Sequence, residues 1–197
     1  VRVSGLSAQV AGPPQRSRNG RSRFGSRPVQ NLYESAKLLA EYLLFHYGAQ
    51  DAIFERVPVP RDGRDFPVRC VHDLIDASSP GSRARALDLG CSVGRSSFEL
   101  GRYCRDVLGI DLSESFIQAA RQLQEKGTLS FEVVTEGDIR DPVEARVPEG
   151  LDRSRARFQV GDAMNLPPDL GRFDLVLAAN LICRLAGPRS FLRRLSD

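Results

Sequence analysis

An acidic residue and two glycines share one short turn, in the run Ala86-Leu87-Asp88-Leu89-Gly90-Cys91-Ser92-Val93-Gly94-Arg95. A second apolar run, Gly109-Ile110-Asp111, places another carboxylate 17 residues after Gly94. Glycines let the backbone pass close to a ligand, and a helix that begins in the turn directs unpaired N–H groups at it. Asp111 is then placed to accept hydrogen bonds from both hydroxyls of a ribose. These residue types at this spacing predict a pocket for a nucleoside.

The spacing of the turn discriminates between nucleoside ligands. A dinucleotide site would read G-x-G-x-x-G, but here Ser92 and Arg95 stand in the third and sixth places counted from Gly90. Asp88, two residues before Gly90, would repel a pyrophosphate and attract a cationic amino acid. S-adenosylmethionine has an ammonium, a sulfonium and no phosphate, so the turn favours this cofactor, with Asp88 near the ammonium. The alternative for the motif alone is an ordinary strand–turn–helix corner.

Strand and helix patterns alternate from residue 85 onward, which predicts an α/β, Rossmann-like fold with a parallel sheet and flanking helices. The expected strands are 85–89, 106–111, 157–160 and 173–178, and the expected helices are 95–103, 114–126 and 188–195. Ser113 and Gly127 bound the middle helix as caps. The fourth strand is apolar after Asp174, so we expect both of its faces to be buried. Residues 129–135 could form an extra strand, and the remainder up to 150 is expected to be an inserted loop.

Two helices are expected before the sheet, within residues 31–80. The first covers 32–47, with Asn31 and Glu34 as a capping box and Gly48 as its end. The second begins at Pro67. The α/β core would then occupy 83–197 and stop after its fourth strand. An apolar edge strand leaves backbone groups unpaired, so we expect a truncated sheet whose last strands are missing, or an edge covered by something else.

Charge is distributed unevenly over the 197 residues, whose net charge is +3. Residues 1–30 contain six arginines and no acid, for a charge of +6, and the rest of the chain carries −3. The basic segment 1–30 is expected to be disordered, and it resembles an organelle transit peptide, although a cytoplasmic location is the first expectation. The acidic remainder gives no reason to expect nucleic acid as a partner. No apolar run is long enough for a membrane span.

The cysteine and histidine content argues against a metal centre. The four cysteines lack C-x-x-C spacing, and only two histidines, His46 and His72, are present. We therefore expect no metal and no disulfide framework.

The glycine turn, the acidic end of the second strand, Gly161-Asp162-Ala163 and the run FDLVLAAN at 173–180 occur in one order. Together they resemble the cofactor-binding half of class I S-adenosylmethionine-dependent methyltransferases. The resemblance implies that Asp88, Gly90 and Gly94 line the methionine end of the cofactor and that Asp111 holds the ribose. It also implies a role at the adenine for three residues, Leu112 at the ring face, Asp162 at the amine and Ala163 through its N–H.

A narrower resemblance covers residues 31–197. Tyr33-Glu34, EYLLFHYG at 41–48, DFPVRC at 65–70, GRSSFEL at 94–100 and AANLICRL at 178–185 are similar to the C-terminal domain of ovothiol-forming enzymes. That domain methylates an imidazole nitrogen of 5-thiohistidine (4-mercaptohistidine), so the resemblance implies a small-molecule substrate. The iron-dependent sulfoxide synthase domain of fused family members is absent here, which implies a companion domain or protein.

Methyl transfer depends mainly on holding the reacting atoms in line, and a neutral imidazole nitrogen is already nucleophilic near neutral pH. The expected substrate-orienting residues are Tyr33, His46, Tyr47, Asn180 and Arg184. His46 is a candidate base, with structural packing as the alternative, and Asn180 is a candidate ligand residue or a helix N-cap. Two other functions stay open, a methyltransferase for a different small molecule and a non-catalytic cofactor-binding fragment.

Overall fold

The computed structural model describes residues 32–48, 65–76 and 83–195, all within one compact unit, Asn31–Asp197. The basic segment 1–30 and the expected capping residue Asn31 lie outside the described residues. None of the described helices is both long enough and apolar enough to cross a lipid bilayer.

Four parallel strands form the central sheet: β1 (Arg85–Leu89), β2 (Asp106–Asp111), β5 (Ala156–Val160) and β6 (Leu175–Leu177). Their order is β5-β2-β1-β6, so the chain runs outward from β1 through β2 to β5 and then crosses back to β6 on the other side of β1. The predicted α/β class with a parallel sheet and flanking helices is confirmed, and the predicted bounds of β1 and β2 are those of the structure. In such a sheet the ligand site lies beyond the carboxyl ends of the strands.

Alternation along the strands gives the sheet two apolar faces. On one face Ala86 and Val107 pack with Phe98, under the helices α1 (Ala36–Tyr47), α3 (Phe66–His72), α4 (Arg95–Leu100) and α5 (Glu114–Lys126). On the other face Leu87 and Leu89 pack with Phe191 of α6 (Pro188–Arg194). This parity puts Asp88 on the side of α4 and α5, at the end of a buried strand.

The fourth strand differs from its prediction. β6 covers Leu175–Leu177 instead of 173–178, and its side chains are only partly covered, with Val176 38% exposed. The expectation that both faces are buried is wrong because β6 lies at the edge of the described sheet, where it pairs with β1 alone. An edge strand has fewer neighbours to cover its side chains, whatever its own apolar character.

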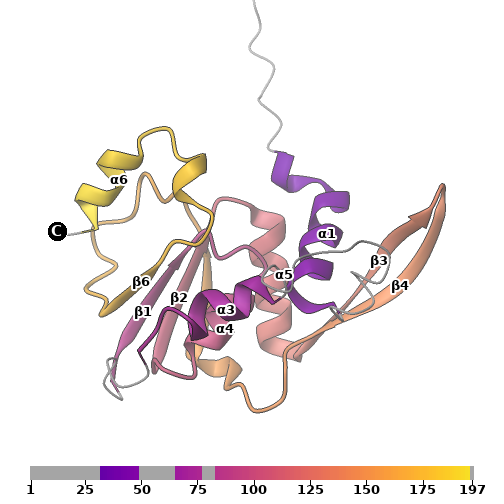
Figure 1. Ribbon diagram of the computed structural model, residues 1–197, viewed down its shortest axis with the longest axis horizontal. Coiled ribbons are helices and arrows are strands. Elements are labelled where there is room, and N and C mark those ends of the chain that lie inside the picture. Colours follow the sequence, from indigo (N-terminus) through magenta and orange to yellow (C-terminus); the bar gives the residue numbers. More distant parts are fainter. Residues whose placement is uncertain (1–31, 49–64, 77–82, 196–197) are drawn as a thin grey trace, which may run out of the picture. The chain divides into compact units, whose positions relative to one another are not determined.

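Residues 136–150 are not the loop that the sequence predicts. β3 (Thr128–Glu136) and β4 (Ile139–Arg146) form an antiparallel hairpin that extends past α1 and α5, away from the parallel sheet (Figure 1). The hairpin is hidden in the sequence because both of its faces are largely exposed, so its outer half shows no alternation of polar and apolar residues. Its base is closed by a hydrogen bond from Val147 N–H to Gly127 O, 2.9 Å long.

The start of the first helix also differs from its prediction. α1 begins at Ala36, and its N-cap is Ser35, whose hydroxyl accepts from Leu38 N–H at 3.2 Å. The expected capping box with Glu34 is therefore wrong. Glu34 belongs to a short 3-10 helix, η1 (Leu32–Glu34), and its carboxylate accepts from Glu114 N–H at 2.8 Å and Ser115 N–H at 3.2 Å. Glu34 thus caps α5, a helix far along the chain, because its charge satisfies N–H groups at that helix's positive end.

We expect Glu34→Gln to lower the free energy of unfolding by about 0.5–1 kcal/mol, because an amide keeps one hydrogen bond to the α5 terminus but loses the charge. Urea unfolding of the variant and the parent chain measures the difference. The control is Glu125→Gln, an exposed residue in the last turns of α5, where loss of negative charge should not destabilise the helix. Equal effects of the two substitutions would contradict the capping role.

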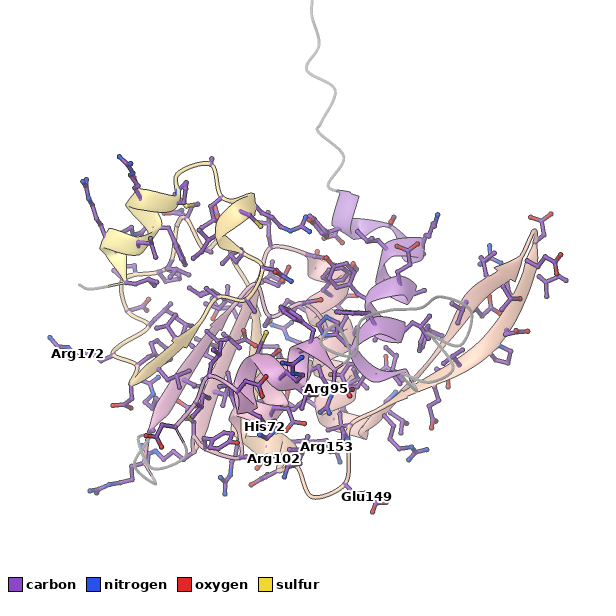
Figure 2. All side chains as sticks on the ribbon, in the orientation of Figure 1. His72, Arg95, Arg102, Glu149, Arg153 and Arg172 are labelled. Atoms are coloured by element: carbon purple, nitrogen blue, oxygen red, sulfur yellow. The ribbon has the colours of Figure 1, made fainter. Side chains whose placement is uncertain are left out.

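An ionic cluster holds α3 against α4. The buried Glu99 carboxylate lies 2.6 Å from Arg95 Nη1, 2.8 Å from Arg102 Nε and 3.0 Å from His72 Nε2. Figure 2 shows these three partners gathered around α3 and α4. The guanidinium contacts hold the pKa of Glu99 below its usual value against the effect of burial, which raises it. A further hydrogen bond, from Ser96 Oγ to Pro67 O at 2.9 Å, fixes the start of α3 beside the cavity described next.

Candidate active site

A cavity of about 620 Å³ lies at the carboxyl ends of the parallel strands, between them and α1. It brings together most of the residues that the sequence nominates, namely Tyr33, His46, Asp88, Gly90, Asp111, Leu112, Asp162, Ala163, Asn180 and Arg184. Gly94 and Tyr47 are not among its lining residues. Residues from η1, α1 and the loops after β1, β2, β5 and β6 therefore meet in one space.

Asp88 is a buried carboxylate that faces this cavity from the end of β1. Its side chain accepts one hydrogen bond from Ser97 Oγ at 2.6 Å, and no Lys or Arg among the described residues pairs with it. Burial raises the pKa of Asp88 to about 7, against the Ser97 hydrogen bond, and the nearby Asp111 raises it further. A buried carboxylate without a cation is costly, so the site is suited to a ligand that brings a positive charge.

Asp111 organises the two loops that follow β1 and β2. Its Oδ2 accepts from Ser92 N–H and its Oδ1 from Ser113 N–H, each at 2.9 Å. These bonds lower the pKa of Asp111, but burial outweighs them and leaves it above the usual value. A carboxylate has about four acceptor positions, so each oxygen keeps capacity for a ligand hydroxyl. The buried Ser92 Oγ, also on the cavity wall, has no hydrogen-bond partner in the described structure.

The residues expected near an adenine lie on the β2 and β5 side of the cavity. Leu112 is 61% exposed, which leaves its apolar side chain available to a flat ring. Asp162 follows β5, and its Oδ1 accepts from Met164 N–H at 2.8 Å in a tight turn that fixes the carboxylate. Ala163 lies in the same turn and lines the cavity. The other Asp162 oxygen is thus available as a hydrogen-bond acceptor at the cavity wall.

The two glycines of the motif have different roles. Gly90 lines the cavity, and a Cβ there would lie 3.3 Å from Leu181 Cδ1, so Leu181 covers the turn closely. Gly94 packs in the core. It has φ +85°, and a Cβ there would lie 2.7 Å from Phe158 Cζ. The structure thus assigns Gly94 to close packing of α4 against β5, while Gly90 remains at the site.

Aromatic side chains form the wall opposite the strand ends, and most of them carry no signal in the sequence that marks them as site residues. They are Tyr42, Phe45, Phe66 and Phe116, together with His46. Tyr42 lies 4.8 Å from Phe116 between ring centroids and stacks on His46 at 5.8 Å. At helical spacing such residues resemble ordinary core, and only their position beside the Asp111 loop distinguishes them.

His46 belongs to this wall through its ring face. Burial, with a contribution from the Arg95 charge, lowers the pKa of His46 to about 3. Its buried Nδ1 has no hydrogen-bond partner among the described residues. A group with so low a pKa is a poor base near neutral pH, so the geometry favours the packing role that the sequence left open. Tyr47 likewise acts in the core, where its hydroxyl donates to Val93 O at 2.8 Å.

Asn180 and Arg184 follow β6 and face the same cavity. Asn180 has φ +53°, a left-handed conformation that asparagine tolerates better than most residues. The following 3-10 helix, η4 (Ile182–Arg184), has Leu181 at its N-cap position and no side-chain cap. The alternative of Asn180 as a helix N-cap is therefore wrong, because the cap position falls one residue later. Arg184 Nη1 donates to the Tyr33 hydroxyl, and its guanidinium lies 5.6 Å from the Tyr33 ring centroid.

A second, shallow depression of about 880 Å³ lies beside α5 and the amino end of β5. Its three arginines are already engaged. Arg121 donates to Phe158 O at 2.9 Å, Arg153 (labelled in Figure 2) to Gln124 O at 2.6 Å, and Arg157 to Asp106 at 2.8 Å. The depression has a larger volume than the cavity at the strand ends, but it is open to solvent. The cavity at the strand ends is therefore the better candidate site.

Comparisons with known proteins identify the cavity-bearing region. A family model described as a methyltransferase domain matches residues 87–197. Magnesium-protoporphyrin O-methyltransferase of Rhodobacter capsulatus is 27% identical over 128 residues, which cover 65% of this chain and 45% of that protein. An uncharacterized methyltransferase of Schizosaccharomyces pombe is 40% identical over 58 residues, or 29% of this chain and 22% of that protein. The chain thus spans less than half the length of these two relatives.

Solved structures give the same kind of match at lower identity. A TehB-like SAM-dependent methyltransferase from Corynebacterium glutamicum is 24% identical, with a TM-score of 0.41, over 68% of this chain and 55% of that one. The N-terminal domain of EvdMO1, solved in the presence of SAH and D-fucose, is 20% identical, with a TM-score of 0.49, over 77% of this chain and 61% of that one.

Proposed function

Because this chain belongs to the methyltransferase domain family, we propose that it transfers a methyl group from S-adenosylmethionine to an imidazole nitrogen of 5-thiohistidine. S-adenosylmethionine is the cofactor. The proposal for this chain is carried by one observation: Asp88, Asp111 and Asp162, at the ends of β1, β2 and β5, line a single cavity in strand order.

The residues present fit the cofactor. Asp88 is a buried carboxylate with no cation partner among the described residues, which suits the methionine ammonium, and Asp111 retains acceptor capacity for the ribose hydroxyls. Leu112 and Asp162 would contact the adenine face and its amine. When bound, the cofactor supplies an electrophilic methyl carbon on a sulfonium. The chain's own contribution is to hold the acceptor in line with that carbon and to exclude water.

The acceptor half of the proposal rests on the segments at 41–48, 65–70, 94–100 and 178–185, which resemble thiohistidine N-methyltransferases. Its support in the cavity is the aromatic wall around Tyr42, whose ring faces and edges can pack against a planar ring. Neutral imidazole has one nitrogen with a lone pair and one N–H, so no base is needed before methyl transfer. Asn180 would place an amide oxygen at the end of β6, where it could accept the remaining N–H.

We expect Asp111→Asn to weaken S-adenosylmethionine binding by roughly 10–100-fold, because the variant loses the charge that strengthens hydrogen bonds to the ribose. Calorimetric titration of the full chain and the variant measures the change. Asp111→Asn is preferred to Asp111→Ala because the amide oxygen still accepts from one of the loop N–H groups. Asp138→Asn, an exposed residue between β3 and β4, is the matched control. Unchanged affinity in the Asp111 variant, or no binding by the folded parent chain, would contradict the cofactor site.

The acceptor is tested separately, by incubating the chain with the cofactor and 5-thiohistidine and identifying the product by mass spectrometry. The proposal requires one added methyl group on a ring nitrogen. Cofactor binding without methylation of 5-thiohistidine would refute this acceptor and leave the cofactor site intact.

A further inference from the structure

The charges that line the active-site cavity are unevenly matched. Among the residues that the structure describes, four carboxylates lie on its wall, those of Glu41, Asp88, Asp111 and Asp162, and one Lys or Arg side chain, that of Arg184. The proposed function assigns three of the four carboxylates to the cofactor. His46 does not add a second positive charge, because burial keeps its imidazole neutral near pH 7. Any anionic group that enters the cavity therefore meets Arg184 as its principal cation.

Arg184 has a weak partner at present. Its Nη1 donates to the neutral Tyr33 hydroxyl, and no carboxylate among the described residues pairs with it. Two other described arginines, Arg157 and Arg102, pair with carboxylates, those of Asp106 and Glu99. A carboxylate offers a guanidinium an opposite charge and two acceptor oxygens for a bidentate pair of hydrogen bonds, whereas a phenol offers one neutral oxygen. An incoming carboxylate would thus displace the phenol from Arg184 with a net gain.

Tyr33 connects two sides of the cavity through separate contacts of its backbone and its hydroxyl. Its carbonyl oxygen accepts from Ser113 Oγ at 3.1 Å and from Ser115 Oγ at 3.2 Å, which anchors its backbone beside the β2 loop. Its hydroxyl meets Arg184, which follows β6 on the other side of β1. The Tyr33–Arg184 pair therefore links the β2 side of the cavity to its β6 side, and the Tyr33 ring packs edge-on against Tyr42 and Phe116. The backbone anchor is separate from the hydroxyl, so the hydrogen bond to Arg184 can open while the Tyr33 backbone stays in place.

We propose that Arg184 determines acceptor specificity by binding an anionic group, a carboxylate, on a small planar acceptor that enters beneath Tyr33. This inference rests on the proposed methyltransferase function and deepens it by naming the substrate class. A planar ring would lie along the wall formed by Tyr42 and Phe116, with its carboxylate directed to the guanidinium. The cofactor also has a carboxylate, which is the competing partner for Arg184, so the test separates the two.

The test compares acids with analogues that lack the carboxylate, in calorimetric titrations of the full chain saturated with S-adenosylhomocysteine. The probe pairs are 5-thiohistidine with its decarboxylated amine, imidazole-4-acetate with imidazole-4-acetamide, and phenylacetate with phenylacetamide. For the parent chain we expect at least one acid to bind roughly 10–100-fold more tightly than its analogue. Arg184→Gln should abolish that preference, and Arg189→Gln, an exposed residue of α6, should preserve it.

Three results would overturn the inference: no preference for the acid in any pair, a preference that survives Arg184→Gln, or a loss of S-adenosylhomocysteine affinity in Arg184→Gln as large as the loss of acid affinity. The last result would assign Arg184 to the cofactor's carboxylate. Failure of the parent chain to bind S-adenosylhomocysteine would instead contradict the proposed function. The same acid and analogue titrations into the protein without cofactor then decide the role of Arg184.

The acid affinity of the Tyr33→Phe variant distinguishes ligand binding by Arg184 from a purely structural Tyr33–Arg184 contact. The variant keeps the ring but removes the hydroxyl that competes for Arg184. If the guanidinium binds acceptor carboxylates, acid affinity should stay constant or rise in this variant. A clear fall in acid affinity would mean that the Tyr33–Arg184 contact only holds the cavity closed.

Discussion

Asp88→Asn is expected to stabilise the protein at alkaline pH. In the folded chain the pKa of Asp88 is raised from 3.8 to about 7 by burial. The unfolded chain therefore releases this proton at a lower pH than the native chain, and ionisation of the buried group lowers stability as pH rises through this interval. The difference corresponds to about 4 kcal/mol above pH 7. An asparagine, which cannot ionise and still accepts from Ser97 Oγ, should escape the penalty.

Urea unfolding of both chains at about pH 5 and about pH 8 measures this effect. The stability gained by Asp88→Asn should be larger at the higher pH by about 2.5 kcal/mol, because about 1.5 kcal/mol of the penalty is already present at about pH 5. Asp169→Asn, an exposed carboxylate outside the cavity lining, reports the effect of removing one negative charge. An advantage of Asp88→Asn that is the same at both pH values would contradict a buried, ionising carboxylate.

The same substitution should impair the cofactor site. A neutral amide attracts an ammonium less than a carboxylate does, so we expect S-adenosylmethionine affinity at alkaline pH to fall by roughly 100-fold. For the parent chain, affinity should also decline as pH falls below the Asp88 pKa of about 7, because the ammonium then competes with a proton. A more stable variant that binds the cofactor poorly would show that the destabilising charge is retained for binding.

Gly94→Ala is expected to lower the free energy of unfolding by about 2–5 kcal/mol, from left-handed backbone strain of about 1–2 kcal/mol and overpacking of about 1–3 kcal/mol. Gly94 has φ +85°, and an added Cβ would lie 2.7 Å from Phe158 Cζ and 3.1 Å from Ala120 Cβ. Both neighbours are in the core. Denaturant unfolding of the variant and the parent chain measures the loss.

Gly137 offers a matched control for Gly94. It also has a positive φ, +56°, but a Cβ there would meet nothing within 4 Å. Gly137→Ala should therefore cost only the strain, about 1 kcal/mol. Combining Gly94→Ala with Phe158→Leu should cost less than the sum of the single changes, because the smaller side chain leaves room for the methyl group. Additive effects would show that crowding by Phe158 is not the cause.

The sequence predicted best those elements whose signals are local. β2 and α5 have the predicted bounds because a buried apolar run and two cap residues, Ser113 and Gly127, mark them without reference to the rest of the chain. Glu34 was misassigned because its hydrogen-bond partners on α5 are 80 and 81 residues away. β4 was missed because its side chains are mostly exposed, which removes the alternation that identifies strands. Hydrogen bonds between residues far apart in the sequence, and strands whose two faces are both exposed, produce no periodic pattern of polar and apolar residues.

Site residues, too, could be predicted where the signal is local and not where it depends on long-range packing. The carboxylates Asp88, Asp111 and Asp162 could be nominated because the ends of parallel strands must meet at one edge of the sheet, and the structure brings them to one cavity. The aromatic wall could not, because Tyr42 and Phe116 have the same spacing as core residues. Gly94 was grouped with the ligand-lining glycines because the motif does not reveal the Phe158 ring behind it.

The β3–β4 hairpin affects the pairing of β2 with β5 during folding, because it lies between these two strands in the sequence. The segment between these strands is long, yet Val147 N–H bonds Gly127 O and closes the hairpin at its base. A hairpin forms on the microsecond timescale, and once formed it removes its own length from the loop that must be closed, a saving of about 0.5 kcal/mol in chain entropy. Its outer end, near Gly137 and Asp138, is therefore a position where the chain could be lengthened with little effect on the folding rate or on the order of the sheet.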